Sequence, residues 1–176
     1  MKLVVLCSGN GSNFENILRS CWKHEVVGMI HNTKDCYARI RANKFGIPSC
    51  YIKHKDEDTM IDCINMVKPD LVVLAGYMRV LSEKVINSVP KMINIHPSLL
   101  PNYKGLHAIE RALESGDDAT GVTVHYVTPE LDSGDIIIQN TVPILQDDTV
   151  ESLTKRIQRM EHSIMPLAID KALSDS

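Results

Sequence analysis

The chain has 176 residues, of which 44% are hydrophobic and 23% are charged, and its formal net charge at pH 7 is -3. This length and composition predict one folded domain over residues 1–176, with enough buried surface to need no disulfides or structural metal. The nearly balanced charge gives no general attraction to nucleic acid or to an anionic membrane, so we expect neither as a partner.

The five cysteines all lie between positions 7 and 63 and include no Cys-x-x-Cys or Cys/His ligand spacing. They predict a reduced, cytoplasmic chain without structural zinc, and no other group of residues has metal-ligand spacing. Cys7 ends the first predicted strand, where a reactive thiol is one alternative, but we predict the commoner role of a small buried residue. The apolar run at residues 1–7 is too short for a signal peptide or a membrane span.

Apolar runs rich in β-branched residues alternate with segments of helical spacing over roughly the first half of the chain. This alternation predicts a parallel sheet with right-handed helical crossovers. Runs such as LVVL contain no polar positions, so helices should cover both faces of the sheet. The predicted strands are Lys2 to Cys7, Val26 to Ile30, Ser49 to Ile52, Leu71 to Leu74 and Met92 to Ile95, and the predicted helices are Asn13 to Ser20, Cys36 to Phe45, Asp58 to Val67 and Ser82 to Asn87.

The pattern changes after Leu106. A helix over 106–115 is followed by two predicted strands, at 121–127 and 135–143, and by a long final helix from Val150 to about Leu173. The loop between the two strands, 128–134, is longer than a hairpin needs, which favours a functional role. The predicted fold class is therefore α/β: a Rossmann-like, open, mostly parallel twisted sheet flanked by helices, with a C-terminal antiparallel strand pair and a long final helix.

A glycine-containing stretch, Ser8-Gly9-Asn10-Gly11-Ser12-Asn13, connects the first strand to the first helix. At this place in an α/β sheet, free backbone N–H groups and the helix dipole attract an anion. The stretch lacks the third glycine of a dinucleotide fingerprint and the Gly-Lys-Ser/Thr of a Walker loop. We therefore predict a phosphomonoester ligand; the alternative is an ordinary turn in which Ser12 or Asn13 caps the helix.

Asn94 and His96 end the fifth predicted strand. Residues two apart on a strand face the same side, so both side chains should project at the carboxyl edge of the sheet, where such folds bind ligands. An amide can stabilise an oxyanion, and an imidazole can transfer a proton. Asp132 is a candidate partner whose charge would raise the pKa of His96. The alternative is that Asn94 and His96 only make the hydrogen bonds of an ordinary turn and take no part in catalysis. Candidate further contacts in the same cleft are Ser98, His107 and His125.

Five longer segments carry a family resemblance: VVLCSGNGSNF, PDLVVLAGYMRVLS, NIHPSLLPNYKGLHAIERALESGD, GVTVHYVTPELDSGDIIIQ and EHSIMP. Together they resemble the folate-dependent formyltransferase family, most closely its members of purine biosynthesis, over almost the whole chain. The resemblance implies the formyltransferase fold and an enzyme of one-carbon metabolism. It implies direct formyl transfer from 10-formyltetrahydrofolate, as co-substrate, to the amine of glycinamide ribonucleotide through a tetrahedral intermediate.

The resemblance also implies three groups of site residues. The catalytic centre would be Asn94, His96 and Asp132; the phosphate and ribose site Gly11, Ser12, Asn13 and Glu161; and the folate pocket Met78, Arg79, Val80, Leu81, Leu131, Ser133 and Gly134. Backbone groups of the folate segments would read the edge of a pterin, while Met78 and Leu81 cover its faces. A cis peptide bond between Leu100 and Pro101 is a further expectation.

Two alternatives stay open for the activity. A nucleotide-sugar N-formyltransferase would share the Asn-x-His pair and the aspartate, because these residues do not name the acceptor amine. A catalytically silent nucleotide-binding module could also use the same fold, since a fold does not by itself prove chemistry. Whatever its activity, we expect the chain to be a monomer or a homodimer.

Overall fold

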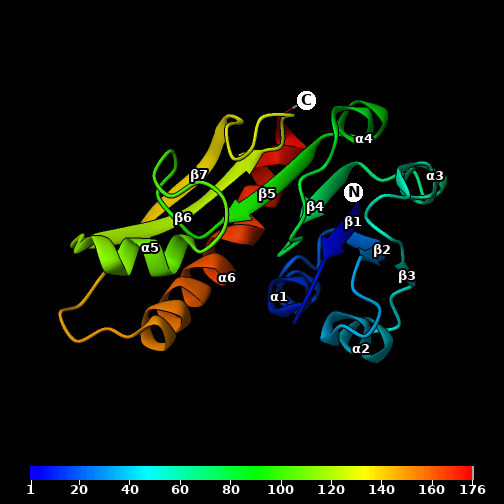
Figure 1. Ribbon diagram of the computed structural model, residues 1–176. Coiled ribbons are helices and arrows are strands. Elements are labelled where there is room, and N and C mark those ends of the chain that lie inside the picture. The colour runs from blue at the N-terminus through cyan, green and yellow to red at the C-terminus, as the bar shows by residue number, and fades with distance from the viewer. Residues whose placement is uncertain (176) are drawn as a thin grey trace.

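The computed structural model describes residues 1–175, which form one seven-stranded sheet with helices on both faces (Figure 1). In chain order the elements are β1 (Lys2–Cys7), α1 (Ser12–Ser20), β2 (Glu25–His31), α2 (Tyr37–Lys44), β3 (Ser49–Tyr51), α3 (Glu57–Met66), β4 (Leu71–Leu74), α4 (Glu83–Ser88), β5 (Met92–His96), α5 (Ala108–Ser115), β6 (Ala119–Tyr126), β7 (Ile136–Pro143) and α6 (Val150–Ser174). None of the helices in this part of the chain is both long and apolar enough to cross a membrane.

The strand order in the sheet is β3-β2-β1-β4-β5-β6-β7. The first five strands pair in parallel, while β6 runs antiparallel to β5 and β7 runs antiparallel to β6. The predicted fold class is confirmed, and each predicted helix and strand is present with ends displaced by at most two residues. The expected cis bond between Leu100 and Pro101 is also present.

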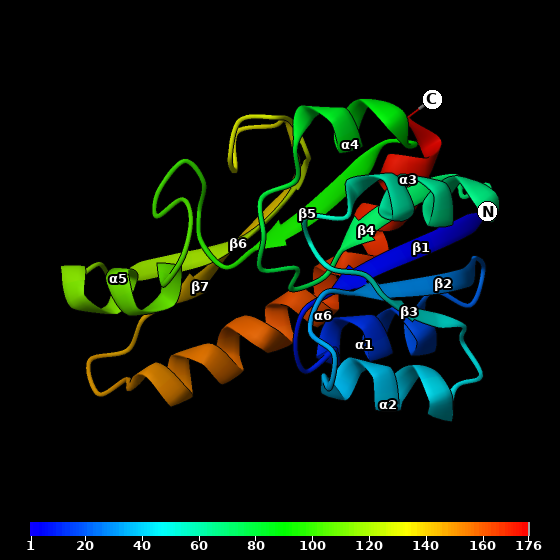
Figure 2. The ribbon, with the colours of Figure 1, turned by 45° about the vertical axis from the view of Figure 1, so that its right-hand side comes forward.

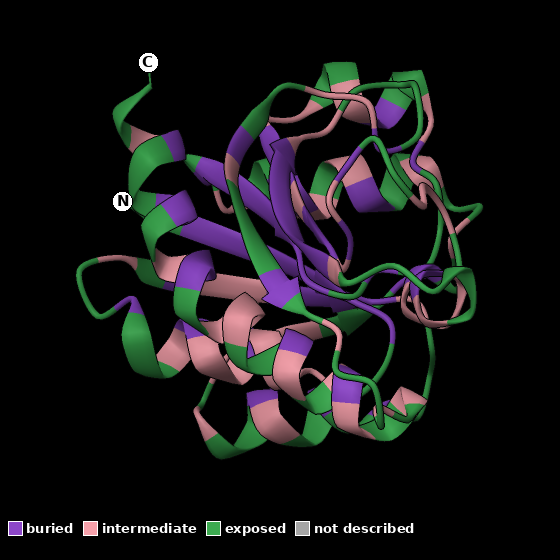
Figure 3. Cartoon of the chain, turned by 90° about the vertical axis from the view of Figure 1, so that its left-hand side faces the viewer, coloured by how far each residue is buried: buried purple, intermediate pink, exposed green. Residues whose placement is uncertain are grey.

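Helices lie on both sides of the sheet (Figure 2), and an apolar layer packs against each of its faces. On one face α1, α2, α5 and α6 cover the strands, with Phe14 of α1 and Leu153 of α6 fully buried among them. On the other face α3 and α4 contribute Met60, Ile64 and Val85. All four residues of β4 are buried because both faces of this central strand are covered, and Figure 3 shows burial concentrated in the strands.

Cys7 lies in the layer beneath α1 and is fully buried. Burial, and to a smaller extent the neighbouring Cys36, raises the pKa of the Cys7 thiol far above its ordinary value. A thiol that stays protonated is a poor nucleophile, so the predicted packing role of Cys7 is confirmed.

The topology brings distant segments to one edge of the sheet. β1, β4 and β5 are parallel, so the loops that follow them leave the sheet at the same edge. The loop between β6 and β7 begins beside the first half of β5, because Tyr126 pairs with Ile93. It then turns back so that Asp132 approaches His96. This return places a carboxylate at the edge that carries the glycine-containing loop.

Candidate active site

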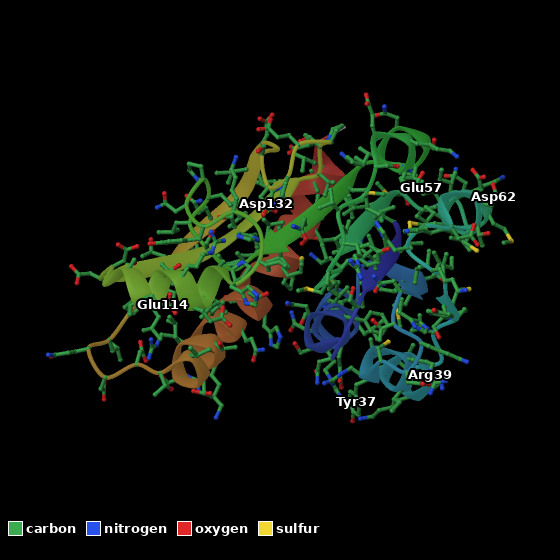
Figure 4. The ribbon with its side chains drawn as sticks, in the orientation of Figure 1. Tyr37, Arg39, Glu57, Asp62, Glu114 and Asp132 are labelled. Carbon is green, nitrogen blue, oxygen red and sulfur yellow. The ribbon has the colours of Figure 1, made fainter. Side chains whose placement is uncertain are left out.

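Four polar side chains meet at the end of β5, and we call Asn94, His96, His125 and Asp132 the polar cluster. His125 is the register partner of Asn94 across β5 and β6, and the Asn94 amide nitrogen lies 3.4 Å from His125 Nε2. The Asp132 carboxylate lies between the two imidazoles, with Oδ2 3.5 Å from His96 Nδ1 and Oδ1 3.6 Å from His125 Nε2. Figure 4 labels Asp132 where the loop after β5 meets β6.

The backbone of two loops fixes the Asp132 carboxylate. Asp132 itself adopts a left-handed conformation with φ 48°, and its Oδ2 accepts a 2.8 Å hydrogen bond from the Gly105 N–H. Two residues later, a Cβ on Gly134 would lie 1.7 Å from the Tyr126 carbonyl oxygen, so only glycine fits there. Lys104 also donates to the Ser133 hydroxyl at 2.7 Å. The loop after β5 and the loop after β6 therefore hold each other.

Backbone carbonyls set the proton positions of both imidazoles. His96 Nε2 lies 2.8 Å from the Tyr103 carbonyl oxygen, and His125 Nδ1 lies 2.9 Å from the Tyr126 carbonyl oxygen. A carbonyl can only accept a hydrogen bond, so these two ring nitrogens carry the protons and donate. His96 Nδ1 and His125 Nε2, which face Asp132, are therefore the nitrogens that lack a proton in the neutral rings.

The electrostatics of the polar cluster differ from the sequence prediction. Burial lowers the pKa of His96 more than the Tyr103 carbonyl and the Asp132 charge raise it, so the net pKa lies below its ordinary value. The prediction of a raised pKa is wrong because it counted the carboxylate and not the burial. For Asp132, burial raises the pKa, but the neighbouring His125 side chain, the hydrogen bond from the Gly105 N–H and the attraction of His96 outweigh it. At neutral pH an ionised Asp132 therefore faces a neutral His96.

The glycine-containing loop after β1 leaves the start of α1 open. Gly11 is the N-cap residue, with φ +80°, and no side chain caps the helix. The alternative in which Ser12 or Asn13 caps α1 is therefore wrong. A Cβ on Gly11 would lie 2.7 Å from Ala38 Cβ, so the loop requires glycine at this point. The uncapped N–H groups of the first turn remain free for an anion.

Glu161 of α6 lies beside this loop. Its Oε2 accepts a 2.9 Å hydrogen bond from the Asn13 side chain, which brings two predicted site residues together. Burial raises the pKa of Glu161 to about 7, although the Asn13 hydrogen bond lowers it in part. Near neutral pH this carboxyl group therefore exists in both protonation states.

The segment after β4 is tied to the glycine-containing loop, because the Met78 N–H donates a 2.7 Å hydrogen bond to the Ser8 hydroxyl. Met78 and Val80 expose more than half of their surface, and Leu131 of the opposite loop exposes 46%. Arg79 is also exposed. Leu81 is buried in the core under α3 and α4, so it cannot cover a pterin face as the sequence suggested.

Of the three further contacts predicted from the sequence, only His125 enters the polar cluster. Ser98 is fully buried, and its hydroxyl donates a 2.5 Å hydrogen bond to the Asn102 carbonyl, so it stabilises a turn. His107 is exposed at the start of α5 with φ 58°, and its side chain makes no hydrogen bond or ion pair with the cluster. For Ser98 and His107 the structure therefore gives no support to the predicted cleft contact.

A separate hollow of about 580 Å³ lies at the amino ends of β1 and β2 and is lined by Trp22, Lys68 and Asp70, among others. It shares no residue with the polar cluster. Ligands of open α/β sheets bind at the carboxyl edge, so the polar cluster is the better candidate for an active site.

Comparison with known proteins agrees with this geometry. Residues 1–169 match the formyl transferase family. The chain belongs to the formyl transferase family. It is 41% identical over 181 residues to the phosphoribosylglycinamide formyltransferase of Escherichia coli (strain K12), with 96% of this chain and 85% of that one aligned.

Two further relatives extend the comparison. The trifunctional purine biosynthetic protein adenosine-3 of Drosophila melanogaster is 40% identical over 182 residues, which are 96% of this chain and 14% of that protein. The crystal structure of phosphoribosylglycinamide formyltransferase from Anaplasma phagocytophilum superposes with a TM-score of 0.94 at 39% identity, covering 99% of this chain and 87% of that chain. This formyltransferase therefore shares both sequence and fold with these proteins.

Sequence reasoning about this formyltransferase underestimated His125 and missed the backbone groups of Tyr103 and Gly105. His125 touches both Asn94 and Asp132, yet its only sequence signal was its closeness to the suspected cleft. The register of β5 against β6 would have paired it with Asn94.

Within residues 1–175, no group of histidine, cysteine, aspartate and glutamate side chains is arranged to hold a metal ion.

Proposed function

We propose that this formyltransferase transfers the formyl group of 10-formyltetrahydrofolate to the amine of glycinamide ribonucleotide in purine biosynthesis. The observation that carries the proposal is the approach of the Asp132 carboxylate to His96, two residues from Asn94 on β5. Its position at the same edge as the open start of α1 supports a two-substrate site. The similarity to a phosphoribosylglycinamide formyltransferase over 96% of the chain supports the choice of substrates.

Gly11, Ser12 and Asn13 would bind the phosphate of the ribonucleotide. The uncapped N–H groups of α1 and its dipole attract the dianion, and Gly11 lets the backbone approach closely. Glu161, held by Asn13, would accept hydrogen bonds from the ribose hydroxyls or the amine end. The ribonucleotide would then extend from α1 toward the polar cluster.

The folate would lie between the segment 78–81 and the loop 131–134. Exposed Met78, Val80 and Leu131 supply apolar surface for the faces of its ring, and the main chain of both segments supplies donors and acceptors for its edge. Lys104 fixes Ser133, and Gly134 fixes the path of the loop. This arrangement would present the formyl carbon to Asn94 and His96.

In the chemical step the substrate amine attacks the formyl carbon, and the carbonyl oxygen becomes an oxyanion. The Asn94 amide, oriented by His125, would donate to this oxygen, and one such donor is worth about 3 kcal/mol in the transition state. Holding both substrates in place supplies much of the remaining acceleration. The formyl group passes directly to the amine without a covalent enzyme intermediate.

His96 would carry the proton between the two nitrogens. Neutral His96 takes a proton at Nδ1 from the attacking amine, which has become positively charged, and returns it to the departing folate nitrogen as the carbon–nitrogen bond breaks. Asp132 stabilises the transient imidazolium, because its Oδ2 faces Nδ1 at 3.5 Å. The cycle consumes and releases no net proton at the enzyme. This role starts from a neutral His96, in line with its lowered pKa, and not from the raised pKa that the sequence predicted.

The direct test is formyl transfer measured by the absorbance of the deformylated folate. Glycinamide ribonucleotide, an amino-sugar nucleotide and water would be offered as acceptors. We expect turnover with the ribonucleotide alone, and a loss of about 100-fold or more in kcat for Asn94→Ala. Turnover only with the amino-sugar nucleotide would agree with the polar cluster as the catalytic centre but would show that glycinamide ribonucleotide is not the acceptor. Folded protein that binds nucleotide without turnover would make the chain a binding module.

A further inference from the structure

The short segment 103–105, in the loop after β5, carries two backbone groups on which the polar cluster depends. The Tyr103 carbonyl oxygen lies 2.8 Å from His96 Nε2, and the Gly105 N–H donates a 2.8 Å hydrogen bond to the Asp132 carboxylate. A shift of this segment would therefore move the acceptor of His96 and the donor to Asp132 together. Whatever holds the segment in place bears on proton transfer.

The segment lies outside helices and strands, and its backbone is not one that it would adopt by itself. Tyr103 has φ 54°, a left-handed conformation that residues with a side chain rarely adopt, and Gly105 has φ 81°. A backbone of this kind persists only where surrounding contacts fix it. Contacts from outside the segment therefore decide where its two backbone groups lie.

Arg111 of α5 contacts the segment in two ways. Its Nη2 donates a 2.5 Å hydrogen bond to the Lys104 carbonyl oxygen, and its Cζ lies 5.7 Å from the centroid of the Tyr103 ring. A planar guanidinium can do both at once, because it donates in its plane and stacks with its face. Side-chain hydrogen bonds from Tyr103 to Asp117 and from Lys104 to Ser133 hold the segment from other sides. Arg111 is the anchor that reaches the backbone of the segment from α5.

The helix gives Arg111 a fixed base. Ala108 and Ala112 of α5 are buried, and Arg111 itself is half-buried. The Arg111 Nε is buried and makes no hydrogen bond within residues 1–175. The guanidinium is therefore held through its Nη2 and through its face, which are the two parts that contact the segment.

We propose that Arg111 is a positioning residue for formyl transfer, which holds the segment 103–105 so that the His96 proton stays on Nε2. The inference rests on the proposed function, because it assumes that His96 Nδ1 takes the proton of the substrate amine. If the segment moved, Nε2 would lose its acceptor and the neutral ring could carry its proton on either nitrogen. A proton on Nδ1 would block the nitrogen that has to accept one. Arg111 thus acts through the segment and not on the reacting atoms.

The test compares the parent chain with Arg111→Met, which removes the hydrogen bond and the guanidinium face. We expect kcat to fall about tenfold, which is part of the factor of about 100 or more that proton transfer supplies. The KM for glycinamide ribonucleotide should stay within about twofold. Nitrogen-15 NMR of the histidine rings should show the His96 proton on Nε2 in the parent and a mixture of both tautomers in the variant.

Three more variants complete the comparison, with melting curves to report that each is folded. Arg111→Lys keeps a donor for the Lys104 carbonyl and should recover most of kcat and the single tautomer. Arg111→Gln serves if the methionine variant does not fold; its amide ends at the level of the arginine Nε, so it should show the same losses. Arg39→Met makes the same change at an exposed arginine of α2, well away from Asp132 in Figure 4, and should change neither readout.

The outcomes separate this inference from the proposed function. A folded Arg111→Met or Arg111→Gln with kcat within about twofold of the parent and a single His96 tautomer overturns the inference alone. A raised KM without a fall in kcat also overturns it, because Arg111 would then act in binding. A parent chain that does not transfer the formyl group to the ribonucleotide overturns the proposed function. The tautomer comparison needs no substrate, so it still decides whether Arg111 positions His96.

Discussion

Replacing Asp132 by asparagine tests the proposed chemistry most directly. The change keeps the size of the side chain and removes the charge that faces His96 Nδ1 at 3.5 Å. Asparagine can still accept the hydrogen bond that the Gly105 N–H gives to Asp132. The loop should therefore stay in place while the transient imidazolium loses its partner.

The distance sets the magnitude. Two unit charges 3.5 Å apart attract by about 5 kcal/mol at an effective dielectric constant near 20 and by about 1 kcal/mol in bulk water. These limits correspond to losses in kcat from roughly tenfold to a few thousandfold, and we expect about 100-fold for this buried pair. The KM for either substrate should change far less, because the charge acts mainly in the transition state.

The pH profile provides an independent readout. Burial already lowers the pKa of His96, and Asp132 opposes that shift, so its removal should lower this pKa further. Because the neutral ring accepts the proton, activity should fall on the acid side as His96 becomes charged. The acid limb of kcat against pH should therefore move to lower pH in Asp132→Asn.

Formyl transfer assays and imidazole titration by NMR would measure both effects. Asp135→Asn is the matched control, since Asp135 lies in the same loop, is exposed, and makes no side-chain hydrogen bond or ion pair with the polar cluster. A variant Asp132→Asn that kept kcat within about threefold of the parent, with the same acid limb, would refute the proton-transfer role.

Three further predictions concern stability. The pKa of Glu161 is about 7, above its ordinary value of 4.5. Protonated Glu161 therefore adds to the free energy of unfolding below pH 4.5, and this contribution, roughly 3 kcal/mol, is lost as the pH rises to 7. Glu161→Gln should remove this dependence from melting curves, and an unchanged dependence would contradict the assignment. A Cβ on Gly121 would lie 2.4 Å from the Asn140 carbonyl oxygen, so Gly121→Ala should lower Tm by about 4–8 °C. Gly28→Ala is the control, because a Cβ there would lie 3.8 Å from its nearest neighbour. Equal Tm values for the two variants would refute the clash at Gly121. Arg156 holds the pKa of Asp148 well below its ordinary value, so this pair should lose its stabilisation only in strong acid. Asp148→Asn should make the free energy of unfolding less dependent on pH in acid. If the variant and the parent lose stability in parallel as the pH falls, other carboxylates are responsible for the loss.

The sequence was sufficient to predict the helices and strands and the position of Asn94 and His96 in the site. Apolar runs without polar positions mark β1 and β4 as covered on both faces, and the structure buries them so. The two-residue spacing of Asn94 and His96 is also local information, because strand geometry alone puts both side chains on one face. The long loop after β6 made Asp132 a candidate partner of His96, and the family resemblance added the expectation that it belongs with Asn94 and His96, because spacing alone could not place it there.

The positions that the sequence misjudged depend on burial and on contacts between distant segments. Leu81 looked like a ligand contact and lies in the core, and Ser98 looked like a cleft residue and holds a turn. The lowered pKa of His96 comes first from burial, which depends on all the segments packed around the ring. Hydrophobic spacing reports which face of an element is covered but not what covers it.

The sequence by itself thus determined the order and type of the secondary structure, the edge of the sheet that carries the site, and the pairing of Asn94 with His96. Only the tertiary structure decided that Asp132 lies between His96 and His125 and that the resting His96 is neutral. The physical reason is that backbone periodicity acts over a few neighbouring residues. Strand register, loop return and desolvation are instead set by the whole packed chain.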